Sequence, residues 1–437
     1  MVAGCHGGSS GNLQSDGPIA DAPEPVAPDA STDAMLGTVS VTVYTWIGDG
    51  AIDPTAVAIF YDGAGNVLQD GTVDAQGVAY GDVPDGGSVT VLQAHTDPMD
   101  LTQRFDRFST IRGLKTGDHL IIGVLSNPTF KSGATDTMTA NYTALDPASG
   151  PSFLLACADA DSTNAGAPYT FTFYATCETP TFDLLTLDSG NGMTEYEWQP
   201  GLTRTPNGSI TVPNTWTPLS HTANALTNTA GNYALGVSLS HVVGGVPFLI
   251  DQAYLPAPTV GENDVSFRYA PVPTPMRFTA LLNEGPAALE RQVVVTTGSP
   301  ATTTMDLAAL PLPVPTHVTQ TATGVTWMQV DQGTPDARFV TWSAMWSDAN
   351  HVVHSAVWEI LEPAVGTTSS LTSVPTMYAN EDPTGAQLRG GSVFYVDYDN
   401  LAGYDAARPK GFSLEDVESS ELDVDHVARS TAGGTYP

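Results

Sequence analysis

The chain has 437 residues, of which 47 are acidic and 14 are basic, and its formal net charge is −33. Such a surface repels phosphate backbones, so we expect no nucleic-acid partner. The 42 glycines and 33 prolines, together with a charged fraction of only 14%, are typical of short strands joined by many turns. No run of about 18 or more apolar residues occurs, and the sequence therefore predicts no membrane-spanning helix.

Residues 1–36 combine an early cysteine with a long polar segment. After Cys5, residues 6–35 are rich in Pro, Ala, Asp and Gly and almost free of large apolar side chains. A segment of this composition cannot bury enough surface to fold, so we expect residues 1–36 to form a disordered tether.

The VAGC sequence at residues 2–5 places small residues directly before Cys5. It resembles the lipobox of bacterial lipoproteins, which implies that the Cys5 thiol carries a diacylglycerol. The membrane would then be a partner through this anchor, and the location would be the outer membrane or the cell surface of a bacterial envelope. A lipobox requires an apolar leader, which we expect upstream of Met1 or trimmed away. The alternative is a free thiol in the unfolded N-terminus of a cytosolic protein.

Strand-like alternation begins directly after the tether. Val39, Val41 and Val43 alternate with more polar residues, and four further apolar runs follow up to Gln93, separated by the turns DGAGN, DAQG and PDGG. Aspartate and glycine supply the backbone conformations that tight hairpin turns require. Strands at this spacing are typical of a β-sandwich.

Residues 56–93 also resemble the carboxypeptidase-regulatory-like module, a transthyretin-like β-sandwich. The matching positions are Asp62, Gly65, Thr72, Asp74, Gly77 and the turn Val83-Pro84-Asp85-Gly86. The resemblance implies a fold for residues 37–125, with IRGLKTGDHLIIG as an added edge pair. It implies no catalytic residues, since such modules serve as spacers or binding platforms.

Residues 126–204 contain the other two cysteines. Cys157 and Cys177 lie in two strand-like runs joined by a turn-rich segment, which a hairpin can bring face to face. If Cys5 is lipidated, these two remain as a pair, and we expect a Cys157–Cys177 disulfide. A loop of about twenty residues closed in this way stabilises by roughly 3 kcal/mol in the chain-entropy model. The alternative is two buried free thiols.

Residues 205–310 and 311–437 continue the same pattern. The run LPLPVP at 310–315 reads as a linker or a proline-protected edge, and residues 338–361 read as a strong hairpin around an SDAN turn. Only ERQ at 290–292 and SLEDVES at 413–419 suggest helix. The whole sequence therefore predicts an all-β fold of tandem β-sandwich domains, Ig-like or transthyretin-like, after the tether.

Motifs for chemistry are scarce. His351 and His354 form an H-x-x-H with Glu359 downstream, but on a strand an odd spacing directs side chains to opposite faces, unless His351 belongs to the turn. We interpret them as two unrelated histidines. No H-E-x-x-H, G-x-S-x-G or phosphate-binding glycine motif occurs. We therefore predict no catalytic residues and no transition-metal site.

Two weaker ligand patterns remain. Asp159 with Asp161, and Asp397 with Asp399 and Asn400, present oxygen ligands at alternate positions, as a structural Ca²⁺ requires, although aspartate also favours turns. Ca²⁺ is the one cofactor that the sequence offers. Separately, Trp342 and Trp346 share one strand face, where they would either stack on sugar rings or pack in a core.

These observations lead to one functional hypothesis and one alternative. We expect an exported, membrane-anchored lipoprotein that acts as a non-catalytic surface binding or structural protein, with a protein or glycan as its partner. The alternative is an anchored or secreted hydrolase with its active site in residues 205–437.

Overall fold

The structure of the protein is a computed structural model. Cys5 and the expected tether, as well as Cys157, Cys177 and Asp161, lie outside the described residues. The structure describes residues 38–45, 51–96, 100, 102–123, 134–143, 145, 150–155, 158–160, 168–174, 180–190, 193–213, 215–229, 234–244, 246–283, 289–298, 301–308, 312–330, 333–348, 350–383, 386–414 and 426–434.

The described chain is built from strands, which confirms the predicted all-β fold with tandem sandwiches. Helical structure within the described ranges is confined to α1 (Tyr404–Ala407) and to the 3₁₀ turns η2 (Thr376–Glu381) and η3 (Arg408–Leu414). The helix expected at 290–292 was wrong, because this segment is a central strand whose two neighbours hold it extended. None of the described helices has the length and apolar character that a membrane span requires.

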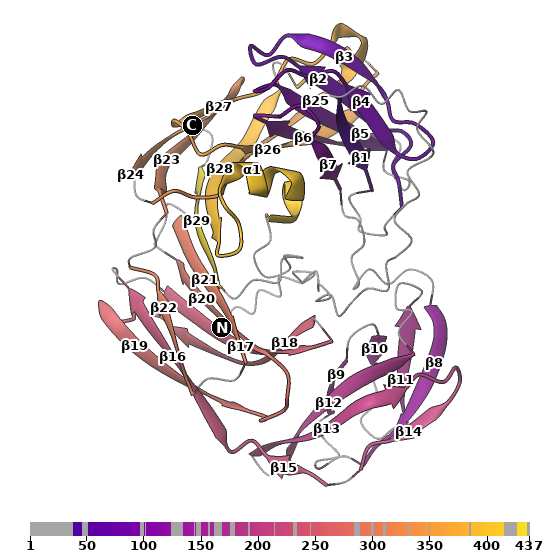
Figure 1. Ribbon diagram of the computed structural model, residues 1–437, viewed down its shortest axis with the longest axis vertical. Coiled ribbons are helices and arrows are strands. Elements are labelled where there is room, and N and C mark those ends of the chain that lie inside the picture. Colours follow the sequence, from indigo (N-terminus) through magenta and orange to yellow (C-terminus); the bar gives the residue numbers. More distant parts are fainter. Residues whose placement is uncertain are drawn as a thin grey trace.

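One twelve-stranded sheet runs through most of the molecule (Figure 1). Its neighbouring strands are antiparallel except for a single parallel pair, β26 with β6. From edge to edge the strands are β18 (Val246–Leu255), β17 (Ala234–Val243), β20 (Met276–Asn283), β21 (Leu289–Thr297), β29 (His426–Gly434), β28 (Gln387–Tyr398), β25 (Ala337–Ser347), β26 (Val353–Glu362), β6 (Gln103–Arg112), β5 (Ser88–Thr96), β2 (Val57–Tyr61) and β3 (Val67–Thr72).

Residues 38–123, which we call the N-terminal module, pack a small sheet on one end of the twelve-stranded sheet. The small sheet consists of β4 (Val78–Gly81), β1 (Val39–Val43) and β7 (His119–Ile122), with β1 in the centre. The alternating valines of β1 are fully buried, as the sequence pattern predicted. Their core also includes Phe339 and Phe394 from the C-terminal region, so the module shares its core with distant parts of the chain.

Two further small sheets cover the rest of the large one. One contains β19 (Gly261–Tyr269), β16 (His221–Thr229) and β22 (Thr302–Asp306), and the other contains β23 (Val314–Thr321), β24 (Gly324–Val330) and β27 (Thr368–Ser370). A single apolar core extends beneath both, with members from Leu92 and Phe108 to Tyr395. The large sheet and this core therefore continue across the boundaries expected at residues 125 and 310.

The remaining strands form a separate sandwich at the lower right of Figure 1. The boundary expected at residue 204 falls inside it, because β14 pairs with β8 and β15 pairs with β13. One sheet consists of β10 (Ala158–Ala160), β11 (Tyr169–Tyr174), β8 (Ala134–Asn141) and β14 (Ser209–Thr211), and the other of β15 (Thr217–Pro218), β13 (Met193–Thr203), β12 (Thr181–Gly190) and β9 (Ser152–Leu154).

Candidate functional site

The structure places the described calcium candidates in two strands and one turn. Asp159 lies in β10 and Asp397 in β28, while Asp399 and Asn400 are exposed in the turn after β28. Asp161 lies outside the described residues. Within the described ranges, no group of three or more His, Cys, Asp or Glu side chains is arranged to hold a metal ion.

The two tryptophan candidates have different environments. Trp342 has no exposed surface, and its Nε1 donates a hydrogen bond to the carbonyl of Thr321 at 2.8 Å. It is therefore a core residue. Trp346 is partly exposed and stacks on His354 with ring centroids 4.8 Å apart, while its Nε1 donates to the carbonyl of Asn380 at 3.3 Å. Only Trp346 retains a surface that a ligand can reach.

The H-x-x-H histidines diverge because one belongs to a turn. His351 is exposed and has a φ of 64°, in the left-handed region. The turn is held by Asp348 Oδ1, which accepts hydrogen bonds from the backbone amides of Asn350 and Val352 at 2.8 and 2.9 Å. His354 lies on β26 and is 1% exposed. The two imidazoles therefore do not form one site.

His354 instead pairs with a carboxylate from the N-terminal module. Its Nδ1 lies 2.5 Å from Asp106 Oδ2, and the side chain of Asp106 is completely buried. Arg104 bridges further, with its Nε 3.0 Å from Asp106 Oδ1 and its Nη2 2.8 Å from Glu381 Oε1. On the other side, His354 Nε2 lies 3.8 Å from Asp348 Oδ2. A charged chain thus joins β6, β26, η2 and the β25–β26 turn.

An Asp–His pair of this kind occurs in acid–base catalysis, where the second imidazole nitrogen contacts a nucleophile or a substrate. Here His354 Nε2 faces the carboxylate of Asp348, and no described hydroxyl hydrogen-bonds to it. The Trp346 ring covers the imidazole face. This arrangement orients and neutralises buried charge, and it lacks the third group of a nucleophilic triad.

We call the parallel pairing of β6 with β26, from Gln103↔Val353 to Ile111↔Leu361, the seam. Phe108 stacks on Trp358 across it, with ring centroids 4.4 Å apart, and Trp358 Nε1 donates to Thr110 Oγ1 at 2.8 Å. Arg107 donates from Nε and Nη2 to one Glu359 oxygen at 2.9 and 2.5 Å. Apolar stacking and charge pairing therefore alternate along the seam.

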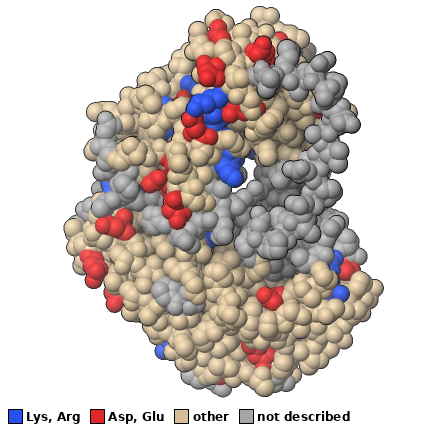
Figure 2. Space-filling model, in the orientation of Figure 1, with Lys and Arg blue, Asp and Glu red and all other residues tan. Residues whose placement is uncertain are grey.

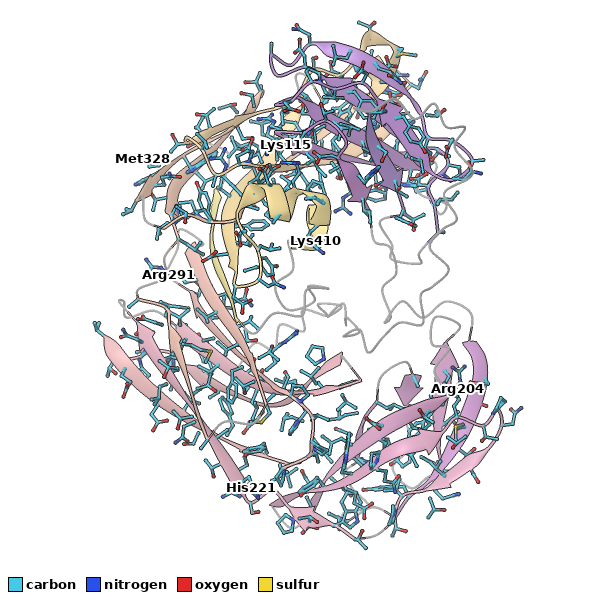
Figure 3. All side chains as sticks on the ribbon, in the orientation of Figure 1. Lys115, Arg204, His221, Arg291, Met328 and Lys410 are labelled. Carbon is cyan, nitrogen blue, oxygen red and sulfur yellow. The ribbon has the colours of Figure 1, made fainter. Side chains whose placement is uncertain are left out.

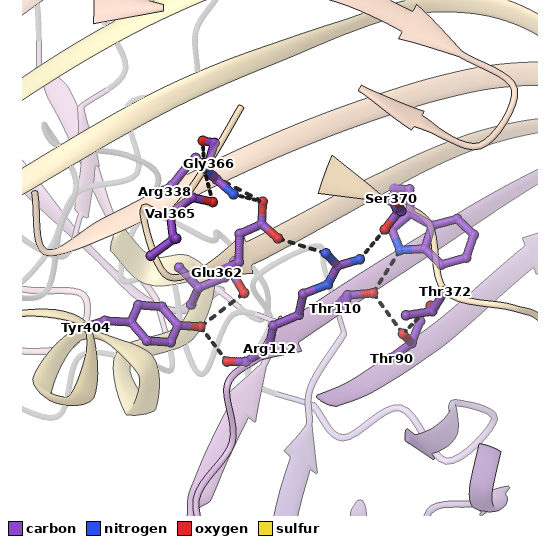
Figure 4. A network of polar contacts seen from close by, with 12 residues as sticks. Thr90, Thr110, Arg112, Arg338, Glu362, Val365, Gly366, Ser370, Thr372 and Tyr404 are labelled. Carbon is purple, nitrogen blue, oxygen red and sulfur yellow. Dashed lines mark hydrogen bonds and ion pairs between the residues drawn. The ribbon is translucent and has the colours of Figure 1, made fainter. Parts of the chain in front are cut away.

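A buried arginine–glutamate network closes the far end of the seam (Figure 4). Glu362 accepts hydrogen bonds from Arg338 at 2.6 and 3.1 Å through Oε1, and from Arg112 at 2.9 Å through Oε2. The Arg338 guanidinium also stacks on Trp327 at 4.6 Å. Burial is the main cause that raises the pKa of the neighbouring Tyr404, whose hydroxyl donates to the carbonyl of Arg112 at 2.7 Å.

The separate sandwich contains a second polar cluster, on the face of β12 and β13 that points inward. Thr186 lies directly opposite Glu197, and Leu184 lies opposite Gln199. Opposite residues in an antiparallel pair share a face. Leu184 packs in the sandwich core, so Thr186 and Glu197 also point into the interior, where they are 0% and 5% exposed.

Asp188 continues this inward face toward one end of the sandwich. Its Oδ2 accepts hydrogen bonds from the Tyr142 hydroxyl and, at 2.7 Å, from the backbone amide of Leu145. Burial first, and then the contact with Asp188, raise the pKa of Tyr142. The Tyr142 ring packs edge-on against Tyr169 and Trp216, with centroids 5.7 and 5.6 Å away.

Glu197 has few partners for a buried acid. Its Oε1 accepts hydrogen bonds from the amide of Thr215 and, at 3.1 Å, from the Thr215 hydroxyl, while Oε2 is buried with no hydrogen-bond partner. Burial raises the pKa of Glu197 above its ordinary value. The cause is desolvation of the carboxylate without a neighbouring positive charge.

Sequence reasoning missed this cluster, although a signal was present. In the strand-like runs at 181–190 and 193–203, polar residues recur at alternate positions within otherwise apolar segments. Asp188 and Glu197 belong to those alternations. A period-two pattern with acids on a buried face indicates an internal polar cluster.

No protein family matches this chain, and no curated protein sequence matches it. Among solved structures, Escherichia coli alpha-2-macroglobulin activated by porcine elastase aligns with 91% of this chain and 30% of its own, at 10% identity and a TM-score of 0.15. The native conformation of the E. coli protein aligns with 92% of this chain and 28% of its own, at 9% identity and a TM-score of 0.11. Scores this far below 0.5 do not indicate a common fold.

Proposed function

We propose that this protein is an exported, membrane-anchored lipoprotein of the bacterial cell envelope that acts as a non-catalytic surface binding or structural protein. The observation that supports this most is the seam. There, the ionisable side chains that most resemble catalytic groups contact one another across two distant segments of the chain. Groups held in this way connect structural elements and stabilise a platform.

The surface charge fits a binding role outside the cytosol. Acidic side chains are spread over the visible face of the molecule, and the main group of basic ones lies beside acidic neighbours in its upper half (Figure 2). With a net charge of −33, the surface favours partners that are basic or neutral. We propose a protein or a glycan as this partner, with Trp346 as an aromatic contact.

The anchor is tested by expressing the protein behind a lipoprotein leader and labelling the cells with palmitate. We expect the wild type to carry the label and to enter the detergent phase on partitioning. Cys5→Ser should lose both properties. The matched control replaces Cys157 and Cys177 together and should keep both, because those cysteines are assigned to the disulfide. A labelled Cys5→Ser protein would contradict the anchor.

The hydrolase alternative is favoured by one observation, the buried Asp106–His354 pair. It is tested on the purified chain with ester, glycoside and peptide substrates. We expect no turnover that depends on His354. The matched variants are His354→Gln, inside the pair, and His351→Gln, on the exposed turn. Turnover that disappears only in His354→Gln would overturn the non-catalytic proposal.

A further inference from the structure

Four buried oxygen atoms without hydrogen-bond partners gather in the separate sandwich. Thr186 Oγ1, Glu197 Oε2 and Gln199 Oε1 come from adjacent positions on the inward face of β12–β13. The fourth, the hydroxyl of Tyr169, comes from the facing sheet. We call these four side chains the Glu197 cluster.

The register places three members of the cluster at neighbouring inward positions of one sheet. Thr186 lies opposite Glu197 on one side and opposite Phe153 on the other, so the three form a row across β13, β12 and β9. The Tyr169 ring packs against Phe153 with centroids 5.0 Å apart. Tyr169 therefore faces this row from the other sheet of the sandwich. Tyr169 is 2% exposed.

Buried polar atoms are nearly always paired in folded proteins, so four orphans in one place require an explanation. All four are oxygens, and one is a carboxylate oxygen that carries charge when ionised. A ligand that satisfies them together accepts electron pairs from oxygen. This describes a hard cation.

The local charge leads to the same conclusion. The sequence from 126 to 219 contains only two basic residues, Lys131 and Arg204. Arg204 is paired with Asp136 at 3.0 Å and stacks on Phe173 at 4.9 Å, at the upper right end of the sandwich in Figure 3. In the described part of the chain, the hydrogen bonds to the Glu197 side chain both come from Thr215. A bound cation would supply the positive charge that its surroundings lack.

We propose that the Glu197 cluster binds one Ca²⁺ ion, with Glu197, Thr186 and Gln199 as its side-chain ligands. Zn²⁺ prefers nitrogen and sulfur ligands, of which the cluster has none. Mg²⁺ demands octahedral geometry and retains several waters, which suits an open site better than a sandwich interior. Ca²⁺ accepts carboxylate, amide and hydroxyl oxygens in irregular geometry. This site is distinct from the aspartate pairs that the sequence suggested.

The experiment uses the full chain after removal of metal with a chelator, titrated calorimetrically with CaCl₂. We expect one Ca²⁺ to bind per chain. Tb³⁺ serves as a luminescent substitute, since the Tyr142 ring packs on Tyr169 of the cluster and on Trp216, and these rings would sensitise its emission. Added Ca²⁺ should quench this emission by displacement. MgCl₂ at the same concentration should displace far less.

Glu197→Gln should lower the Ca²⁺ affinity at least tenfold, because it removes the only charged ligand. The matched control is Glu262→Gln, the same change at an exposed position of β19, and it should leave the affinity unchanged. Unchanged affinity in Glu197→Gln, or no Ca²⁺ binding by the wild type, would overturn the proposal. The latter result would mean that water alone fills the cluster.

Thr186→Val separates ligand loss from misfolding. It deletes an unpaired hydroxyl with little change of shape, so the calcium-free protein should melt at the wild-type temperature or above it. Its Ca²⁺ affinity should nevertheless fall several-fold. A Thr186→Val protein that is folded and binds Ca²⁺ like the wild type would contradict the assignment, whatever the outcome with Glu197→Gln.

Discussion

His241 illustrates how a single residue couples stability to pH. Its side chain has no exposed surface, and Nδ1 lies 3.0 Å from Thr274 Oγ1. Burial lowers the pKa of His241 from 6.5 to about 4, since the charged imidazolium loses its hydration. The unfolded chain therefore binds this proton at a higher pH than the folded chain. The resulting stability is complete above about pH 6.5 and is lost as the pH falls through about 4.

We predict that this one residue destabilises the protein by about 3 kcal/mol between pH 7 and pH 4, from roughly 1.4 kcal/mol per unit of pKa shift. The free energy of unfolding in urea, measured across this range, should decline less steeply in His241→Gln. The control is His221→Gln, at an exposed position of β16. Equal pH dependence in His241→Gln and wild type would show that His241 is not the titrating group.

Individual residues also show which contacts could not be predicted from the sequence. Strand parity does not separate His351 from His354, because His351 lies in the turn before β26 and His354 alone is on the strand. The partner of His354 could not be predicted, since Asp106 lies 248 positions away and no local pattern encodes that distance. The same holds for Glu197: its alternation is visible in the sequence, whereas its lack of a countercharge depends on the fold.

At the scale of elements, alternation and turn residues predicted most strands. The hairpin of β25 and β26 forms around the expected SDAN turn, and β2 and β3 flank the expected DGAGN turn. The parallel pairing of β26 with β6 was not predictable, because a period-two pattern reports which face is buried and is silent about the neighbouring strand. The run RQVVVTT at 291–297 predicted most of β21, and only the helix suggested at 290–292 was wrong.

Substituting glycines of the N-terminal module tests how closely its two sheets pack. A Cβ atom on Gly81, in β4, would lie 2.5 Å from the Phe60 ring, which is buried in the core between the two sheets. We predict that Gly81→Ala destabilises by about 1–3 kcal/mol, as overpacking does. Gly71→Ala, on the edge strand β3, is the matched control, because its Cβ would meet nothing within 4 Å. Thermal unfolding measures both. Equal melting temperatures for the two variants would contradict this packing.

At the scale of the whole molecule, the sheet makes distant segments depend on one another. The N-terminal module contributes β2, β3, β5 and β6 to the large sheet and shares its core with Phe339 and Phe394. The resemblance to the carboxypeptidase-regulatory-like module implied a boundary near residue 125, because it covers one segment of the chain and says nothing of the strands that pair with it. Backbone pairing across that boundary depends on tertiary contacts, which a local sequence pattern does not encode.

We therefore predict that residues 126–437 do not behave as an independent unit. Removing the module leaves β26 unpaired along its seam edge, from Val353 to Leu361, and uncovers the Trp358 ring that Phe108 stacks on. A long unpaired strand edge pairs readily with other chains, so the fragment should self-associate. Light scattering coupled to size exclusion measures its mass. The control is residues 38–437, which removes only the expected tether and should behave like the full chain. A monomeric 126–437 fragment with native tryptophan fluorescence would show that the seam is dispensable for the fold.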